Sequence, residues 1–445
     1  MDTSIFKAYD VRGVYPQTMN KHIAYSIGYA FSQIVGGDTV CIGSDMRLSG
    51  PEVKQGLVQG LNAGGMRVVD IGLVSTDMVT FAVGKFQYDG GIMITASHNP
   101  SEYNGMKMVG KHAVPISSNH LLFDIRDYAA QVDHHIETPL QSIEKDIWED
   151  WVDHVLQFVH VDKIKPLKIV VDAGNGMGGK VIEYFQKALP QLTIEPLYFE
   201  LDGSFPNHQP SPIEDHNTQE MRNKVLELEY DCGMAFDGDA DRVFLCDEQG
   251  EIIWGTEMTA MIAESLLLKY PQETILYNAI CGWIVPETIQ KYGAISKRTQ
   301  VGHSLIKQDM AKTGAIFAGE HSGHYYFRDN YRADSAIIAA LVVLDLLSQS
   351  SEPLSSLVRN YKKYYASGEI NSHVENIPQK LEAIKEKYCN AKSIDTLDGV
   401  SVWYDTYWFN VRPSNTEPLL RLNVEAKDHE QLQQVTKEIL HFIRS

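Results

Sequence analysis

The sequence has no long apolar run and no excess of positive charge, and both absences exclude whole classes of protein. No stretch is long enough to span a membrane, and the first residues lack the basic and then apolar segments of a secretory signal. We therefore expect a cytoplasmic protein without membrane contact. Acidic residues outnumber basic ones, 58 to 39, for a net charge of −19, which argues against a nucleic-acid partner because such proteins need a basic face.

Closely spaced cysteine pairs are also missing. The five cysteines show no Cys-x-x-Cys spacing, and several fall singly in apolar stretches; they are Cys41, Cys232, Cys246, Cys281 and Cys389. This pattern predicts buried free thiols in a reducing cytoplasm.

What is present is an alternation of apolar strands and helical segments. The N-terminal part predicts a helix over 21–34, a strand over 39–45, a helix with Ser49 as its N-cap, and a strand over 67–72. The segment 6–15 alternates apolar and polar residues like an edge strand that turns at Gly13. Strands and helices joined by short glycine-rich connections favour parallel α/β units.

The same pattern restarts twice. Apolar strands that end in small residues begin again near 167–176 and near 274–280, which predicts three similar α/β units. The tail, with strands near 402–404 and 408–411 and a helix over 430–443, predicts a small α+β domain. We expect domain I over 1–146, domain II over 147–248, domain III over 249–364 and domain IV over 365–445, with a helix beginning in the acidic stretch 144–150.

Ser97 follows the short apolar strand Ile92–Ile94 and precedes Asn99-Pro100, which cannot continue a central strand because proline has no N–H. The strand therefore presents Ser97 and His98 on a tight turn at its end, where open α/β sheets place their chemistry. Taken alone, the segment could equally be a polar strand-to-turn junction.

Asp237, Asp239 and Asp241 alternate with small residues. Residues two apart point the same way in an extended or gently turned backbone, so we expect the three carboxylates to converge and to need a cation to offset their repulsion. An EF-hand is excluded, although Glu248 has its spacing, because Arg242 occupies the glycine position and the flanks resemble strands. A ligand set made only of oxygen atoms suits Mg²⁺, so we predict a Mg²⁺ site here in preference to the alternative, a solvated acidic turn.

Two later loops carry further polar groups. Residues 319–324 follow an apolar strand and contain Glu320, Ser322 and His324, which can hold a diol or serve as a polar loop. Residues 412–416 combine a guanidinium, hydroxyls, an amide and turn N–H groups, which could bind an anion or form a plain turn. Lys107 reads as a surface lysine from the sequence alone.

Four of these segments, in this order, resemble the motifs of the α-D-phosphohexomutases, and within them the bacterial phosphomannomutase/phosphoglucomutase group. The four segments are 95–100, 237–242, 319–324 and 412–418. The resemblance implies three related α/β domains with mixed sheets and a smaller C-terminal α+β domain around a central cleft. It also implies a phosphotransferase that acts as an isomerase.

For the reacting end of the site, the resemblance implies that Ser97 carries the transferred phosphoryl group. Mg²⁺ would bridge this phosphate and the three aspartates, with Arg242 nearby to balance the charge. Lys107, at the family's Asn-Gly-x-Lys position, is expected to act as general acid and base. Further proton-transfer candidates are His98 and, more weakly, His303 and His324.

For substrate binding, the resemblance implies that Glu320 and Ser322 hold the O3 and O4 hydroxyls of the sugar. The residues expected to contact phosphate or line the cleft are Tyr9, Arg12, His324, Arg412, Ser414, Asn415 and Thr416. Phosphomannomutases often have methionine where this chain has His321, which is a departure from the subgroup.

We therefore predict a phosphomannomutase that interconverts mannose 6-phosphate and mannose 1-phosphate, and the glucose pair as well, through hexose 1,6-bisphosphate. Its partners would be small hexose phosphates, and the protein a monomer or small homo-oligomer. The alternatives within the family are a phosphoglucomutase or a phosphoglucosamine mutase. Remoter alternatives are a Mg²⁺-dependent sugar-phosphate phosphatase and a non-catalytic sugar-phosphate binding protein.

Overall fold

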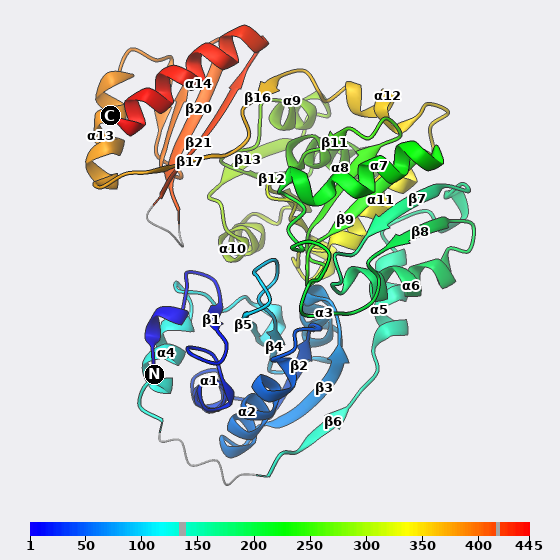
Figure 1. The fold of residues 1–445 in the computed structure, drawn as a ribbon, viewed down its shortest axis with the longest axis vertical. Coiled ribbons are helices and arrows are strands. Elements are labelled where there is room, and N and C mark those ends of the chain that lie inside the picture. The colour runs from blue at the N-terminus through cyan, green and yellow to red at the C-terminus, as the bar shows by residue number, and fades with distance from the viewer. Residues whose placement is uncertain (133–138, 415–418) are drawn as a thin grey trace. The chain divides into compact units, whose positions relative to one another are not determined.

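The computed structural model describes residues 1–132, 139–414 and 419–445. They divide into two compact units, whose helices and strands are labelled in Figure 1. The first unit comprises Met1–Trp254 and Ser322–Ser355, and the second comprises Gly255–His321 and Ser356–Ser445.

The first unit begins with a mixed sheet in the strand order β1-β5-β4-β2-β3-β6. Strands β2, β3, β4 and β6 run parallel, whereas β5 is antiparallel to β4 and to the edge strand β1. The bounds are β1 (Val11–Val14), β2 (Thr39–Ser44), β3 (Arg67–Leu73), β4 (Gly90–Ile94), β5 (Tyr103–Gly110) and β6 (Ser142–Glu144). Strand β4 is buried throughout, as expected for an interior strand covered on both faces. The predicted edge strand is present, but it continues through Gly13.

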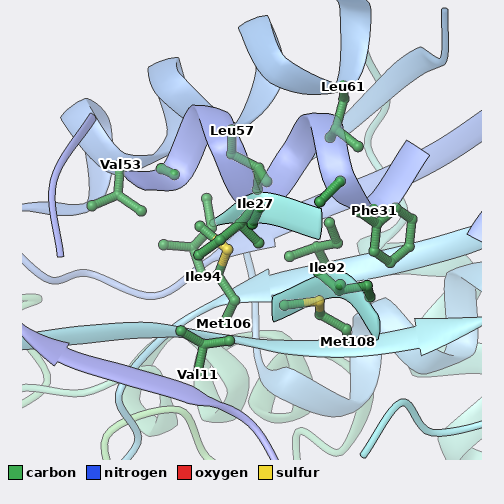
Figure 2. Close-up of a cluster of buried hydrophobic side chains, with 14 of the residues drawn as sticks. Val11, Ile27, Phe31, Val53, Leu57, Leu61, Ile92, Ile94, Met106 and Met108 are labelled. Atoms are coloured by element: carbon green, nitrogen blue, oxygen red, sulfur yellow. The ribbon is translucent and has the colours of Figure 1, made fainter. Parts of the chain in front are cut away.

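Helices α1 and α2 cover one face of this sheet. Ile27 and Phe31 of α1 and Leu57 of α2 pack toward Ile92 of β4 and Met108 of β5 (Figure 2), all buried in one core cluster. The helices of this part are α1 (Lys21–Val35), α2 (Gly50–Ala63), α3 (Thr76–Phe86) and α4 (Leu122–Ala129).

The predicted helix over 21–34 and strands over 39–45 and 67–72 are confirmed within about one residue. Ser49 does occupy the position before α2, but its side chain caps nothing there; its Oγ accepts a hydrogen bond from Asn104 Nδ2 at 2.8 Å instead.

The first unit also holds a second mixed sheet, in the order β11-β10-β9-β7-β8. Its strands are β7 (Lys168–Asp172), β8 (Thr193–Leu197), β9 (Cys232–Phe236), β10 (Val243–Asp247) and β11 (Ile252–Ile253). The first unit also contains α5 (Trp148–Leu156), α6 (Gly178–Ala188), α7 (Gln219–Leu228), the short strand β15 (Tyr325–Phe327), which is not part of this sheet, and α11 (Ala336–Ser348). The helix expected to begin in 144–150 begins at Trp148, whose backbone N–H donates to Asp146 Oδ1 at 2.9 Å, while Glu144 is the last residue of β6.

The second unit contains parallel strands β12 (Thr274–Asn278), β13 (Ile295–Thr299) and β14 (Phe317–Gly319), with helices α8 (Gly255–Lys269), α9 (Ile284–Lys291) and α10 (His303–Thr313). Helix α12 (Leu354–Arg359) lies where the chain passes between units. The C-terminal sheet packs against α14, as Figure 1 shows in red and orange. Its elements are β16 (Tyr365–Ala366), β17 (Ile370–His373), β18 (Ser393–Asp395), β19 (Val400–Trp403), β20 (Tyr407–Pro413), β21 (Leu419–Ala426), α13 (Ile377–Lys387) and α14 (His429–Arg444). The small α+β domain is thus confirmed.

The internal repeat predicted from the sequence is visible in the strand connections. Strands β2, β7 and β12 each pair in parallel with two neighbours, β3 and β4, β8 and β9, and β13 and β14. The loops that carry Ser97, the three aspartates and Glu320 follow β4, β9 and β14. Each of the three polar loops therefore follows the strand that has the same position in its own repeat.

Four of the five cysteines are buried and all five are free, as predicted; Cys389 is exposed, because it lies in the turn after α13. In the part of the chain that the structure describes, no helix has both the length and the apolar character needed to cross a membrane.

Candidate active site

Ser97 is fully buried at the end of β4 and has a left-handed backbone conformation, with a φ of 52°. Its N–H donates to Thr95 Oγ1 at 2.8 Å, and its Oγ donates to Asp237 Oδ2 at 2.9 Å. Arg242 Nη2 lies 3.1 Å from the same Oγ. The hydroxyl is therefore fixed between a carboxylate and a guanidinium, although left-handed backbone is unfavourable for serine.

The three aspartates lie in the loop between β9 and β10, and one carboxylate oxygen of each lies within 4.8 Å of those of the others. All three residues are buried. Asp237 Oδ1 accepts the backbone N–H groups of Asp241 and Arg242, each at 3.1 Å, which closes the loop. Burial, followed by the charges of Asp241 and Asp239, raises the pKa of Asp237 to about 7.

This cluster fits a divalent cation. Asp239 Oδ1 is buried and finds no hydrogen-bond donor among the described residues, which is costly for a carboxylate oxygen unless a cation satisfies it. The three candidate ligands are all carboxylates, the donor type that Mg²⁺ prefers. The repulsion among them supplies a second reason for a cation here.

Lys107 is not a surface lysine; it lies on β5 with its side chain at the aspartates. Its Nζ is 2.7 Å from Asp239 Oδ2 and forms a close ion pair with Asp241 Oδ2. Burial opposes its charged form, but attraction to Asp239 and Asp241 outweighs burial and raises the pKa of Lys107. The lysine therefore carries a proton and offsets part of the acidic charge.

His98 lies beside Ser97 and packs on Arg242. Its Nδ1 is 3.4 Å from Ser97 Oγ and in close contact with Arg242 Nη2. Burial and the neighbouring Arg242 charge hold the pKa of His98 well below its usual range. The imidazole is therefore neutral at pH 7. Its backbone oxygen accepts a hydrogen bond from Gln209 Nε2 at 2.9 Å.

Arg12 also reaches the Ser97 loop. Its Nε donates to Asp10 Oδ2 at 2.8 Å, and its Nη1 contacts Asn99 Oδ1. Tyr9, the other residue predicted here, is partly exposed just before β1.

His324 and Ser322 belong to the first unit as well. His324 Nε2 is 3.5 Å from Asp241 Oδ1 and 3.9 Å from Asp334 Oδ2, and its Nδ1 is 3.1 Å from Ser322 Oγ. Burial opposes protonation, but the hydrogen bond to Asp241 raises the pKa of His324 above its usual value. His324 thus lies at the aspartate loop.

Sequence reasoning missed two residues that support these loops. Thr76, after β3, donates from Oγ1 to Asp239 Oδ2 at 2.5 Å and from its N–H to Asp239 O at 3.1 Å. Arg47, after β2, donates to the backbone of the Ser97 loop. A usable signal exists in both cases, because polar residues that follow parallel strands meet at the carboxyl edge of the sheet.

In the second unit, Glu320 follows β14 and is almost fully buried. Its Oε1 accepts from Asn278 Nδ2 and from the backbone N–H of Gly302, both at 3.3 Å. His303, next to Gly302, begins α10. His321 Nδ1 lies 3.3 Å from Thr256 Oγ1, and burial lowers the pKa of His321.

The C-terminal sheet presents two guanidiniums instead of the single one predicted. Arg412 on β20 lies directly opposite Arg421 on β21. Glu369 bridges them: its Oε2 accepts from Arg412 Nη2 at 2.8 Å and its Oε1 from Arg421 Nη1 at 2.9 Å. Arg421 Nη2 also donates to Ser414 Oγ at 3.2 Å. The predicted residues Asn415 and Thr416 lie outside the described residues.

Comparisons with known proteins agree on one family. The models for domains I, II and III and for the C-terminal domain of phosphoglucomutase/phosphomannomutase match residues 3–135, 149–250, 254–364 and 369–442. A phosphomannomutase of Escherichia coli is 37% identical and covers 99% of each chain.

Solved structures with a similar fold include members of the same family. A phosphoglucomutase/phosphomannomutase family protein of Burkholderia thailandensis has a TM-score of 0.89 at 33% identity, covering 99% of this chain and 97% of that one. An Aspergillus fumigatus N-acetylphosphoglucosamine mutase, solved with GlcNAc-6P and magnesium, shares the fold with a TM-score of 0.65 at 13% identity, covering 99% of this chain and 96% of that one.

Fold, polar loops and relatives together define the class of the protein: an isomerase that moves a phosphoryl group on a hexose phosphate. The chain belongs to the phosphoglucomutase/phosphomannomutase family, with all four domains of that family represented.

Proposed function

We propose that this phosphohexomutase is a phosphomannomutase that reversibly interconverts mannose 6-phosphate and mannose 1-phosphate and also accepts the glucose pair. The observation that carries the proposal is the position of Ser97 Oγ, 2.9 Å from Asp237 Oδ2 and 3.1 Å from Arg242 Nη2. A serine so held, next to a buried acidic loop that fits Mg²⁺, is suited to carry and donate a phosphoryl group.

In the transfer step, the bond between Ser97 Oγ and phosphorus breaks as a sugar hydroxyl oxygen bonds to phosphorus. One proton leaves the sugar hydroxyl and one is gained by Ser97 Oγ, so the step needs a group that can carry a proton. We assign this work to Lys107 and His98, with Arg242 stabilising the departing serine oxygen. The reverse transfer, from the other phosphate of the hexose 1,6-bisphosphate, regenerates the phosphoserine.

Mg²⁺ would be held by Asp237, Asp239 and Asp241 together with the Ser97 phosphate. When bound, it would offset negative charge on the transferring phosphoryl group. The cluster of buried carboxylates supports this proposal, as does the magnesium found together with GlcNAc-6P in the Aspergillus fumigatus relative.

Substrate recognition is proposed for the remaining predicted residues. We assign the O3 and O4 hydroxyls to Glu320 and Ser322. The phosphate distant from Ser97 is assigned to Arg412 and Ser414, with Asn415 and Thr416. The buried guanidinium of Arg412 supports the anion role because it can bind a phosphate in a bidentate manner. We further assign Tyr9, Arg12, His303 and His324 to contacts with the bound hexose phosphate.

The test is the phosphorylation of Ser97 together with a substrate panel. Intact mass of the isolated protein should show one phosphoryl increment in a fraction of molecules, absent in Ser97→Ala and retained in the neighbouring control Ser101→Ala. With glucose 1,6-bisphosphate present, mannose 1-phosphate should be converted with little release of inorganic phosphate. An increment that survives in Ser97→Ala would contradict the assignment, and rapid phosphate release would identify a phosphatase.

A further inference from the structure

Arg47 is the most completely buried cation near the Ser97 loop, with 1% of its surface exposed, and it lies just after β2. Strands β2 and β4 are parallel neighbours, so the residues after them share one sheet edge. We propose that Arg47 is a positioning residue for the phosphoryl-transfer step, which holds the backbone of residues 97–103 so that Ser97 faces the aspartates. The inference rests on the proposed role of Ser97.

The guanidinium of Arg47 binds the loop through backbone carbonyls only. Its Nη2 donates to the carbonyl oxygens of Ser97 and Asn99, both at 2.7 Å, and its Nη1 donates to those of Pro100 at 2.7 Å and Tyr103 at 2.9 Å. Four carbonyls are thus satisfied by one side chain. A planar fork of donors suits this arrangement, whereas the ammonium of lysine has only three donors on one nitrogen.

The guanidinium of Arg47 is also held in place by residues outside the 97–103 loop. Its Nε lies 3.3 Å from Asp45 Oδ2, and Asp45 Oδ1 accepts the backbone N–H of Arg47 at 3.1 Å. The ring of Phe205 lies 5.2 Å from the guanidinium carbon. Because both charges are buried and paired, the cation has one well-defined position from which to hold the loop.

The loop needs such support because Ser97 adopts a left-handed conformation that its side chain does not favour, with a φ of 52°. The aspartate loop also lies close to the Ser97 carbonyl, which is one of the four that Arg47 binds: a Cβ added to Gly238 would lie 2.5 Å from Ser97 O. The position of this carbonyl therefore sets the separation between Ser97 and the aspartates. A displacement of the reacting group by about 1 Å costs about 100-fold in rate.

The experiment compares Arg47→Ala and Arg47→Lys with the control Arg222→Ala, which removes an arginine–carbonyl bond to Gly250 in another loop. We expect kcat for mannose 1-phosphate to fall about 100-fold in Arg47→Ala and about 10-fold in Arg47→Lys. KM should stay within about threefold, because the proposed substrate contacts are untouched. The control should keep the wild-type kcat. Hydrogen exchange should increase in the peptide 97–103 of both Arg47 variants.

Chemical rescue separates positioning from a general structural role. Arg47 lies in the wall of a surface cavity of about 730 Å³, together with Lys54, Asp70 and Leu201, so a small cation can reach the site emptied in Arg47→Ala. Millimolar guanidinium chloride should recover at least a tenth of the lost kcat, whereas equal methylammonium chloride should not.

Several outcomes would overturn the inference: a kcat within twofold of wild type in a folded Arg47→Lys, a raised KM with unchanged kcat, or no rescue by guanidinium. Failure of both variants to fold would also overturn it, because Arg47 would then be a core residue only. The wild-type protein decides the proposed function separately, because Ser97 must first be phosphorylated by glucose 1,6-bisphosphate. If it is not, the proposed function fails and not the role of Arg47 in holding the loop.

Discussion

Replacing Asp239 by asparagine should separate metal binding from folding. Asp239 is fully buried and faces Lys107 at 2.7 Å, while its partners Asp237 and Asp241 offer oxygens within 4.8 Å. At an effective dielectric constant of about 20, the attraction to Lys107 is about 6 kcal/mol and the two repulsions are at least about 3.5 kcal/mol each. The repulsions together are at least as large as the attraction, so Asp239→Asn should leave the free energy of unfolding without Mg²⁺ unchanged or raise it slightly.

With Mg²⁺ present, the variant should differ strongly from the wild type. A cation at 100 times its Kd stabilises the folded state by about 2.7 kcal/mol, and after a 100-fold loss of affinity the same concentration gives only about 0.4 kcal/mol. Turnover should be nearly abolished, because the site loses one of three charged ligands.

The assay is urea unfolding of both proteins with and without Mg²⁺, with calorimetric titration of Mg²⁺ and initial rates over a range of Mg²⁺ concentrations. Asp153→Asn, on the exposed side of α5, is the matched control for the change in charge. Equal stabilisation by Mg²⁺ in wild type and Asp239→Asn, or normal activity of the variant at low Mg²⁺, would refute the assignment of the aspartate loop.

Three further predictions test other parts of the molecule. Mannose and glucose 1-phosphates should have kcat/KM values within about tenfold of each other, because O3, O4 and a distal phosphate are common to both; a preference of several hundredfold, about 3–4 kcal/mol, would indicate an unrecognised contact at C2, with His321 the first candidate. Arg421→Met should raise KM for the 1-phosphates with little change in kcat, since it removes the guanidinium opposite Arg412. Initial rates that show a lowered kcat and an unchanged KM would contradict a role of Arg421 in phosphate binding. Burial opposes protonation of His208, but its hydrogen bond to Asp172 outweighs burial and raises the pKa of His208. The resulting stabilisation of the folded state is complete below the unfolded pKa of about 6.5 and is lost as pH rises through the folded pKa. His208→Gln should therefore lower the urea midpoint more at pH 6 than at pH 8.

The sequence was sufficient for the loops whose chemistry is local. The structure does bring Asp237, Asp239 and Asp241 together, although it does so through a turn with a left-handed Ala240 that is closed by Asp237 Oδ1, and not through extended backbone. Strand ends could be located from apolar runs that stop at polar residues, which is why Ser97 and Glu320 were placed correctly at the ends of β4 and β14.

Residues whose role depends on strand order or register could not be found in this way. Arg47 acts on the Ser97 loop only because β2 lies beside β4, and Arg421 faces Arg412 only because β20 and β21 pair in that register. Lys107 was a surface residue by its local pattern, yet the antiparallel pairing of β5 with β4 directs it to the aspartates. Tertiary pairing overrides local pattern at all three positions.

The left-handed backbone at Ser97 also has an evolutionary consequence. Glycine, asparagine and aspartate all adopt such a φ more readily than serine does. Substitution of Ser97 by one of them should therefore leave the stability of the folded protein unchanged or increase it. Only the need for a hydroxyl at that point opposes such a substitution. A relative with glycine or asparagine at this position should therefore be a well-folded protein that has lost phosphoryl transfer, and gene copies released from selection should reach that state early.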